Sequence, residues 1–430
     1  MINMINKIKT GVSEKSKSKN ILKNIFMGLS LIGPGLFLIG YNIGTGSITT
    51  MGMAGARYGM TLLWVVVLSG VLTYILMVAF GHLTLVTGRT ALHNFKTEIR
   101  GGKILALYIM AALILGEILA LIGIMGIVAE LIQEGIRLFS PGQTLMVETG
   151  WIILITITLL FFALWYGKYK MFEKILTVLV ILMALCFVAV FFMVSPSYSV
   201  ILKGMIPGIP DTSGAYMLVA AMAGTTISAA VFIIRSTVVA EKGWTIKNLK
   251  DEKRDAFVSA SMMVFLSAII MAVAAGTLHV MGLTLSSTID MIRMLGPIGG
   301  DAAALLLIIG ITGAGLSTIF PIVLIAPWLI ADYSGRPRDI KSPMFRGLIV
   351  VGLLFAFGSI FLDQTPPLLM VVSQAFQATI LPAVAIPVFI LLNKKGVMGG
   401  YLPSKKWNLA LMSVILFSLI TTYFAIRGFF

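Results

Sequence analysis

The stretch 40-GYNIGTGSI-48 lies near the middle of an apolar segment that otherwise looks like one membrane-spanning helix. It combines glycines with hydroxyl and amide side chains, and each glycine costs about 1 kcal/mol relative to alanine in a helix interior. Backbone groups left unpaired at membrane depth are costly unless protein or a polar cavity surrounds them. The stretch therefore predicts a helix that is broken at membrane depth, next to something polar.

The composition is that of a polytopic membrane protein. The chain is 58% hydrophobic and 11% charged, with a mean hydropathy of +1.02. Residues 1–24 are polar and basic and precede no small-residue cleavage site, so we expect a basic cytoplasmic tail and no cleaved signal peptide. The single cysteine, Cys186, lies in an apolar run, which argues against a disulfide framework and a thiolate metal site.

Apolar segments of about 20 residues are long enough to cross a bilayer, and the chain has eleven of them. Of the 32 Lys and Arg residues, 26 lie in the N-terminal tail and in the loops after the even-numbered segments. The positive-inside rule then places the N-terminus in the cytoplasm and the C-terminus outside the cell membrane. The net charge of +15 reflects this topology and contact with anionic lipid, and does not indicate nucleic-acid binding. The predicted spans are 25–56, 61–86, 104–134, 150–166, 174–195, 215–240, 255–282, 301–331, 347–363, 366–393 and 407–427.

A second interrupted segment, 220-AAMAGTTISAAVFIIRS-236, follows five spans after the first. Small residues also pack helices together in membranes, which is the simpler explanation for one such cluster. Two clusters one repeat apart favour a transporter built from inverted repeats. We expect a transporter core over 25–393 with repeats 25–195 and 215–393, then a loop and a peripheral helix over 394–430.

The run 33-GPGLFLIGYNIGTGSITTMGMAGARYGMTLLW-64 resembles the first helix of the Nramp divalent-metal transporters, whose pattern is GPA…Y-x-D-P-G-N…AGA-x-YG-x-TLLW. The segments 373-SQAFQATILPAVAIP-387 and 313-GAGLSTI-319 are similar to the tenth and eighth helices of that family. The resemblance covers most of the chain and places it in the amino acid–polyamine–organocation superfamily. It implies an all-α integral membrane fold of eleven helices, a leucine-transporter-type 5+5 inverted repeat with helices 1 and 6 broken.

The positions that bind metal in that family have changed in this sequence. The family uses the Asp and Asn of D-P-G-N and the Met of M-P-H, and two acids of its third helix relay protons. The third-helix positions correspond to Ile124 and Ile127 here. A transition metal prefers imidazole, thioether or carboxylate ligands, so we predict no transition-metal site. The residues at the two motifs are Gly44, Thr45, Gly46 and Ser47, and Ser228, Ala229 and Ala230.

The string IGTG also resembles the first-helix motif of amino-acid permeases, whose backbone N–H groups receive a substrate carboxylate. A break exposes the first N–H groups of the next half-helix, which carries a partial positive charge and can bind an anion. Glycines let a substrate approach that backbone closely. Hydroxyls at the second break would bind the other polar groups, although a bond to the helix's own carbonyl is an equal alternative for each. The predicted substrate-binding residues are Asn42, Gly44, Thr45, Gly46, Ser47, Thr225, Thr226, Ser228 and Gln374.

The stretch 314-AGLST-318 resembles the eighth-helix sodium site of leucine-transporter-type symporters. Neutral oxygens from hydroxyls and unwound backbone suit a hard monovalent cation at the membrane midplane. Ser and Thr also pack helices together, so helix packing is the alternative to an ion site here. The predicted sodium ligands are Gly40, Ile43, Ala314, Ser317 and Thr318, with Na⁺ as coupling ion and no other cofactor.

Two ionisable residues within spans are candidates for gating or coupling. Glu117 lies deep in the third span, where a carboxyl is functional by default, with a hydrogen-bonded structural carboxyl as the alternative. Arg235 lies about two turns after Ser228 and could guide an anion from the cytoplasmic mouth, although a snorkelling arginine is the commoner case. The chain contains no nucleotide-binding loop, catalytic triad or His–Cys cluster, so we predict no enzyme.

These patterns lead to one main functional prediction and two alternatives. The main prediction is sodium-coupled uptake of a small carboxylate-bearing solute, an amino acid or organic acid, by a monomer in the plasma membrane. The first alternative is a divalent-cation transporter, with hydrated Mg²⁺ as the most tenable ion because hydroxyls can hold its waters. The second is a membrane sensor that keeps the fold and transports nothing.

Overall fold

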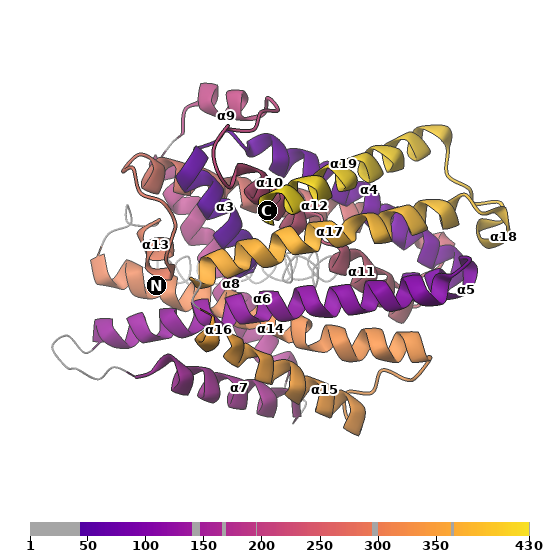
Figure 1. The fold of residues 1–430 in the computed structure, drawn as a ribbon, viewed down its shortest axis with the longest axis horizontal. Helices are drawn as coiled ribbons and strands as arrows, with labels where there is room; N and C mark the ends of the chain where they lie inside the picture. Colours follow the sequence, from indigo (N-terminus) through magenta and orange to yellow (C-terminus); the bar gives the residue numbers. More distant parts are fainter. Residues whose placement is uncertain are drawn as a thin grey trace, which may run out of the picture.

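The computed structural model describes residues 44–139, 147–165, 169–194, 196–294, 300–362 and 365–429. Over these ranges the chain is helical and contains no strand (Figure 1). The α-helices are α3 (Thr45–Tyr58), α4 (Leu63–Thr87), α5 (Ala91–Glu98), α6 (Gly102–Phe139), α7 (Thr149–Trp165), α8 (Tyr169–Val194), α9 (Tyr198–Gly204), α10 (Ala215–Thr226), α11 (Ala229–Glu241), α12 (Leu249–Ala274), α13 (Thr288–Arg293), α14 (Gly300–Ser334), α15 (Pro343–Leu354), α16 (Gly358–Phe361), α17 (Pro366–Leu392), α18 (Lys395–Met398) and α19 (Lys405–Phe429).

The predicted spans correspond to long apolar helices. Among the described residues, eight helical segments are long and apolar enough to cross a membrane, and α7, with 17 residues, is a shorter apolar helix. The first predicted span, 25–56, is described only from residue 44 onward, so the count of eleven stays a prediction. The spans that fall within the described residues lie where hydropathy places them, because a helix in lipid needs a continuous apolar surface over its whole length.

The second break is confirmed. The helix α10 ends at Thr226, two residues with non-helical backbone follow, and α11 begins at Ala229. The carbonyl of Thr226 at the open end accepts a hydrogen bond of 3.0 Å from the hydroxyl of Thr73 on α4. Gly224 lies inside α10 and not at the break, and a methyl group there would overlap the backbone oxygen of Gln374 on α17. Its role is to let two helices pack closely.

The structure describes the helix that follows the predicted first break. The helix α3 begins at Thr45 with Gly44 as its N-cap, so the glycine-rich stretch does start a helix as predicted. The residues before Gly44, including the predicted ligands Gly40, Asn42 and Ile43, lie outside the described residues.

The centre of the molecule brings distant segments together. Figure 1 shows α6 lying between α17 and α14, and both helices make extensive contacts with it. The helix α10 packs against α17, and α19 lies along α17 and α10. Because α6 is surrounded in this way, a polar residue in its middle can reach side chains from both neighbours.

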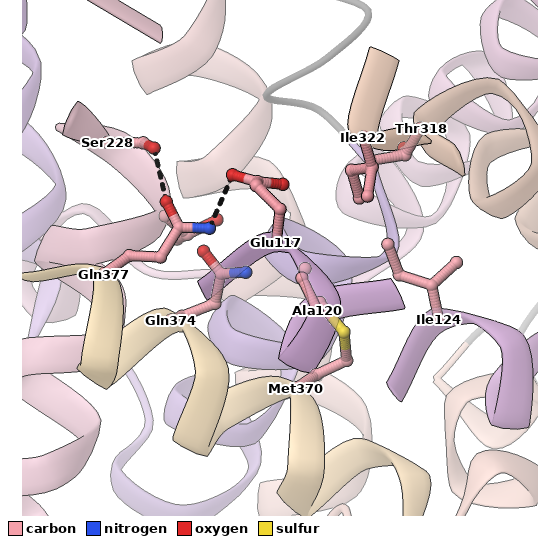
Figure 2. A pocket seen from close by; sticks show the side chains of 12 residues that line it. Glu117, Ala120, Ile124, Ser228, Thr318, Ile322, Met370, Gln374 and Gln377 are labelled. Carbon is pink, nitrogen blue, oxygen red and sulfur yellow. Dashed lines mark hydrogen bonds between the residues drawn. The ribbon is translucent and has the colours of Figure 1, made fainter. Parts of the chain in front are cut away.

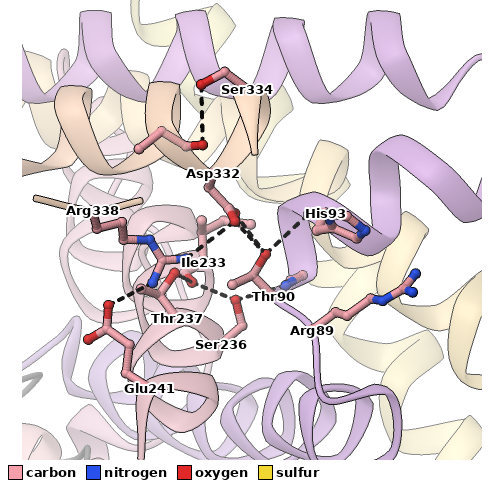
Figure 3. Close-up of polar contacts among 12 residues, drawn as sticks. Arg89, Thr90, His93, Ile233, Ser236, Thr237, Glu241, Asp332, Ser334 and Arg338 are labelled. Carbon is pink, nitrogen blue, oxygen red and sulfur yellow. Dashed lines mark hydrogen bonds and ion pairs between the residues drawn. The ribbon is translucent and has the colours of Figure 1, made fainter. Parts of the chain in front are cut away.

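One end of α11 is tied to its surroundings by polar contacts (Figure 3). Thr90 donates to Asp332 on α14 over 2.7 Å, and Arg338 contacts both Asp332 and Glu241. Ser236 on α11 accepts a hydrogen bond of 3.0 Å from the first backbone N–H of α5. These contacts join α11, α5 and α14 into one polar junction.

The short helix α13, between two spans, has a capping box that is sensitive to acid. Asp290 accepts hydrogen bonds from the backbone N–H groups of Ser287 at 2.9 Å and Ser286 at 3.1 Å, and from both hydroxyls. Burial alone would raise the pKa of Asp290, but these bonds outweigh it and lower the pKa below its usual value.

We therefore expect Asp290→Ala to destabilise the protein by about 1 kcal/mol, the usual effect of losing a cap. A carboxyl with a depressed pKa contributes stability that is present above its unfolded pKa, about 3.9, and is lost as the pH falls through the folded value. Thermal unfolding of wild type and Asp290→Ala at pH 7 and pH 3 measures this. If the difference in the free energy of unfolding between wild type and Asp290→Ala stayed constant down to pH 3, the ionised carboxylate would not be what caps α13.

Candidate functional site

A cavity lies between the two broken helices. It is surrounded by the start of α3, the middle of α6, the open ends of α10 and α11, and parts of α14 and α17 (Figure 2). The start of α3 and the second break, between α10 and α11, are thus walls of the same cavity. The lining residues are Gly44, Gly46, Glu117, Ala120, Ile124, Thr225, Ser228, Thr318, Ile322, Met370, Gln374 and Gln377.

A buried carboxyl of α6 is held in this cavity by a chain of hydrogen bonds. Glu117, whose surface is 3% exposed, accepts a bond of 2.9 Å from the amide nitrogen of Gln377. The amide oxygen of Gln377 in turn accepts a bond of 2.7 Å from the hydroxyl of Ser228 (Figure 2). The carboxylate is an acceptor, so it selects the amide orientation that leaves the Gln377 oxygen facing Ser228. Three helices, α6, α17 and α11, meet through these side chains.

Met370 supplies the cavity with a thioether, the ligand type that is absent from the sixth-helix motif in this chain. Its sulfur packs where a side chain at Gly123 would be, 2.9 Å from the position of a Cβ atom there. Its methyl carbon lies 3.1 Å from the corresponding position at Gly46. The two glycines, on α6 and α3, therefore make the room in which this side chain reaches the cavity. Neither Met370 nor Gln377 is among the predicted ligands, because no local motif marks them.

The start of α3 approaches α14 closely. A methyl group on Gly44 would overlap the hydroxyl oxygen of Thr318 and lie 3.0 Å from its Cβ. Only glycine fits at this position with the present packing, which gives the helix start a steric reason independent of any ligand.

Most of the predicted substrate-binding residues line the cavity: Gly44, Gly46, Thr225, Ser228 and Gln374 do, together with Glu117 and Thr318. Three others do not. Ser47 lies 3.2 Å from the Thr225 hydroxyl, Thr226 donates to the carbonyl of Met222 over 2.9 Å, and the hydroxyl of Thr45 has no partner among the described residues. For Thr226, the bond to its own helix was the right alternative.

The predicted sodium ligands on α14 are joined by hydrogen bonds within the helix. Ser317 and Thr318 each donate to the carbonyl of Ala314 over 2.8 Å, which is the ordinary arrangement of hydroxyls within a helix. Thr318 lines the cavity, whereas Ser317 and Ala314 do not. Gly40 and Ile43 fall outside the described residues, so Na⁺ as coupling ion stays a prediction.

The prediction for Arg235 does not hold. The side chain neither snorkels to the surface nor reaches the cavity: it is fully buried and forms ion pairs with Glu252 and Asp255 on α12. A buried arginine with two carboxylate partners has no free charge with which to attract an anionic substrate. The arginine and its partners are 17 and 20 residues apart, too far for a pattern within one helix to reveal the contact.

A family model described as natural resistance-associated macrophage protein-like matches residues 35–426. The chain belongs to the Nramp family. It is therefore a multi-pass membrane protein from a family of membrane transporters. The resemblance of its first, eighth and tenth helices to Nramp patterns is confirmed along most of its length.

Relatives of the Nramp family match over nearly the whole chain. The divalent metal cation transporter MntH of Erwinia tasmaniensis is 25% identical over 398 residues, which cover 91% of this chain and 92% of the relative. The transporter of the same name from Staphylococcus aureus is 25% identical and covers 93% and 92%.

Solved structures agree on the fold. The Eremococcus coleocola manganese transporter, solved in complex with an aromatic bis-isothiourea substituted compound, has a TM-score of 0.69 at 16% identity and covers 93% of this chain and 87% of its own. Mhp1, a nucleobase-cation-symport-1 family transporter, has a TM-score of 0.60 at 14% identity and covers 92% and 93%. The predicted leucine-transporter-type architecture is confirmed.

The main functional prediction, sodium-coupled uptake of a carboxylate-bearing solute, is wrong. Nramp membership and relatives named divalent metal cation transporters overturn it. The physical error is also visible in the cavity. The prediction relied on the loss of the first-helix Asp, which removes a negative charge that would repel an anion, but Glu117 places a buried carboxyl in the same cavity.

Proposed function

We propose that this chain transports a divalent metal cation, which binds in the cavity between the two broken helices. The observation that supports this most directly is Glu117, a buried carboxyl that lines the cavity and is positioned by Gln377 and Ser228. A buried carboxylate is costly unless a cation or hydrogen bonds compensate it. The names of the Nramp relatives, which cover nine-tenths of the chain, support the same class of substrate.

The groups in this cavity that could bind a metal differ from those of a site built from His, Cys, Asp and Glu side chains. Among the described residues, no three His, Cys, Asp or Glu side chains lie close enough to hold a metal. The described residues that line the cavity instead offer one carboxylate, the amides of Gln374 and Gln377, hydroxyls, and the thioether of Met370. Gln374 makes no side-chain hydrogen bond to any described residue that would compete with a ligand. Oxygen donors and retained water suit a hard divalent ion, and the thioether adds affinity for a softer one.

The test is uptake by purified protein in liposomes. We expect uptake of Mn²⁺, Mg²⁺ or both above that of empty liposomes, with no dependence on amino acids or organic acids. Uptake of a carboxylate-bearing solute without any divalent cation would overturn the proposal. Measuring each ion with and without Na⁺ in the same assay also tests the sodium prediction.

Met370→Leu tests which divalent ion the site prefers. The exchange nearly conserves volume and removes only the sulfur. We expect uptake of Cd²⁺ relative to Mg²⁺ to fall about tenfold, which corresponds to about 1.4 kcal/mol for one lost soft ligand. Met271→Leu, at a buried methionine of α12 outside the cavity, is the matched control. An unchanged ratio in Met370→Leu would mean that the thioether only fills space.

The proposal also includes the orientation of the chain in the membrane. The distribution of basic residues supports a cytoplasmic N-terminus and an extracellular C-terminus in the plasma membrane. That the transporter acts as a monomer is part of the proposal. A tag after Phe430 should then be accessible from outside intact cells, whereas a tag before Met1 should not. The reverse labelling would contradict the span count and the repeat assignment.

A further inference from the structure

The short helix α9, in the connection between the fifth and sixth predicted spans, exposes a cluster of apolar side chains. Figure 1 shows this helix at the upper edge of the molecule, outside the bundle of long helices. The exposed fractions are 87% for Tyr198, 66% for Leu202 and 67% for Ile206, and Met205 is exposed as well. A contiguous group of large apolar side chains on a surface marks an interaction site, whereas single ones do not.

The exposed apolar side chains form one stripe along α9. Tyr198, Leu202 and Met205 follow the spacing i, i+4 and i+7, which brings residues to the same face of a helix. Polar residues flank the stripe, because Ser199 and Lys203 are exposed on the neighbouring side of the helix. The exposed surface of α9 is therefore amphipathic. We call Tyr198, Leu202, Met205 and Ile206 the apolar stripe.

The other face of α9 is fixed to the turn between α3 and α4. Ile201 packs against the hydrophobic core, and Gly204 is buried so close to this turn that a methyl group on it would overlap the backbone oxygen of Met60. After the helix, the indole N–H of Trp64 donates to the carbonyl of Gly208 over 3.0 Å. Because these contacts hold the helix, the apolar stripe keeps facing away from the protein.

The apolar stripe continues a surface that faces lipid. The helix α8, which precedes α9 in the chain, is apolar, and its last turn exposes Phe192 and Met193. Pro196 lies in the connection between the two helices, and the axis of α9 is turned by 116° from that of the end of α8. The chain thus leaves a membrane-spanning helix sideways and carries the apolar surface with it.

The bilayer fits this surface better than a protein partner does. Apolar side chains beside a lysine, with a tyrosine at one end, are typical of a helix that lies in the membrane interface. Lys203 can extend its ammonium group to the headgroups while its stem stays in apolar surroundings. A stable protein interface buries about 800 Å² on each partner, which is far more than one face of a helix of seven residues offers.

We propose that α9 is an interfacial anchor, whose apolar stripe lies at the boundary between the headgroups and the acyl chains of the bilayer, with Lys203 at the level of the lipid phosphates. The bilayer then holds the turn between α3 and α4, and with it the C-terminal end of α3, at a fixed depth. The other end of α3 starts at the cavity, where Gly44 and Gly46 line it. This inference does not depend on which solute the chain transports.

Spin labels on single cysteines test the position of α9. The chain has one cysteine, the buried Cys186, so Cys186→Ala provides a background in which one introduced thiol is labelled. In vesicles of phosphatidylcholine and phosphatidylglycerol, oxygen partitions into the acyl chains and a nickel chelate stays in water. We expect the label on Leu202→Cys to collide mainly with oxygen. The label on Lys203→Cys, about 100° further round the helix, should collide more with the nickel chelate.

Two exposed positions serve as matched controls. Ser213 lies in the same connection after α9, and the label on Ser213→Cys should collide mainly with the nickel chelate. Leu159, on the apolar helix α7, is 64% exposed, and the label on Leu159→Cys should collide mainly with oxygen. All four variants change exposed side chains, so their folding should match that of the background protein.

Two results would overturn the proposal. If the label on Leu202→Cys collided with the nickel chelate as often as the label on Ser213→Cys, α9 would lie in water. If the label on Leu202→Cys were shielded from both reagents, a protein would cover the apolar stripe; broadening of its spectrum by a second label would identify that protein as another copy of this chain. A preference for oxygen like that of Leu159→Cys supports the interfacial anchor.

Discussion

Glu117→Gln should abolish divalent-cation uptake. Glutamine keeps the size of the side chain and can still accept a hydrogen bond from Gln377. The exchange removes the only carboxylate among the described residues that line the cavity. Removing one partner of a buried charge pair typically costs about 3–5 kcal/mol. Since 1.4 kcal/mol is a factor of ten, cation affinity should fall by about a hundredfold to a few thousandfold. Isothermal titration with Mn²⁺ and Mg²⁺, followed by liposome uptake, measures both.

Glu134→Gln is the matched control for this variant. Glu134 lies on the same helix, outside the cavity, and pairs with the exposed Arg137 at 3.5 Å. An exposed or partly exposed pair contributes at most about 1 kcal/mol, so this exchange should leave cation binding within a fewfold of wild type. If wild type and Glu117→Gln bound the cation equally well, the cation would not bind in this cavity and the proposal would be wrong. Equal losses in both variants would indicate a general effect of charge on α6.

Gly44→Ala should have the second largest effect. The added methyl group would overlap the hydroxyl of Thr318, which is itself held by its bond to Ala314. Either Thr318 changes rotamer or α3 moves away from α14, and both change the shape of the cavity. Overpacking of this kind costs about 1–3 kcal/mol, which corresponds to a loss of about fivefold to a little over a hundredfold in cation binding or uptake.

Two further variants make this test specific. Gly347→Ala, in α15, adds the same methyl group where nothing lies within 4 Å and should leave uptake unchanged. Thr318→Ala in combination with Gly44→Ala removes the overlapping hydroxyl, leaves the Cβ atom at 3.0 Å, and should restore part of the activity. Full activity in Gly44→Ala alone, or a defect that Thr318→Ala does not relieve, would show that this contact does not shape the cavity.

The functional prediction failed because it considered the metal ligands position by position. The Asp, Asn and Met of the family's two motifs are absent, which made a metal site look lost. A cation needs donors around one point in space, and these can come from any helix that faces the cavity. Here Glu117 on α6 and Met370 on α17 face it, while the motif helices contribute glycines and hydroxyls.

The sequence by itself determined the features that depend on neighbouring residues. The apolar spans, the start of α3 after Gly44 and the break between α10 and α11 follow from hydropathy and from glycine and hydroxyl clusters. These are local effects, because a helix in lipid must satisfy its backbone within one segment.

Only the tertiary structure decided which side chains meet. Gln377 reaches Glu117 across 260 residues, and Arg235 finds Glu252 and Asp255 on the next helix instead of the surface. Such contacts depend on the angles and rotations at which helices pack, which no single segment encodes. The polar partners of a buried charge are therefore set by packing, since a buried charge must be compensated by whichever groups the folded chain brings within reach.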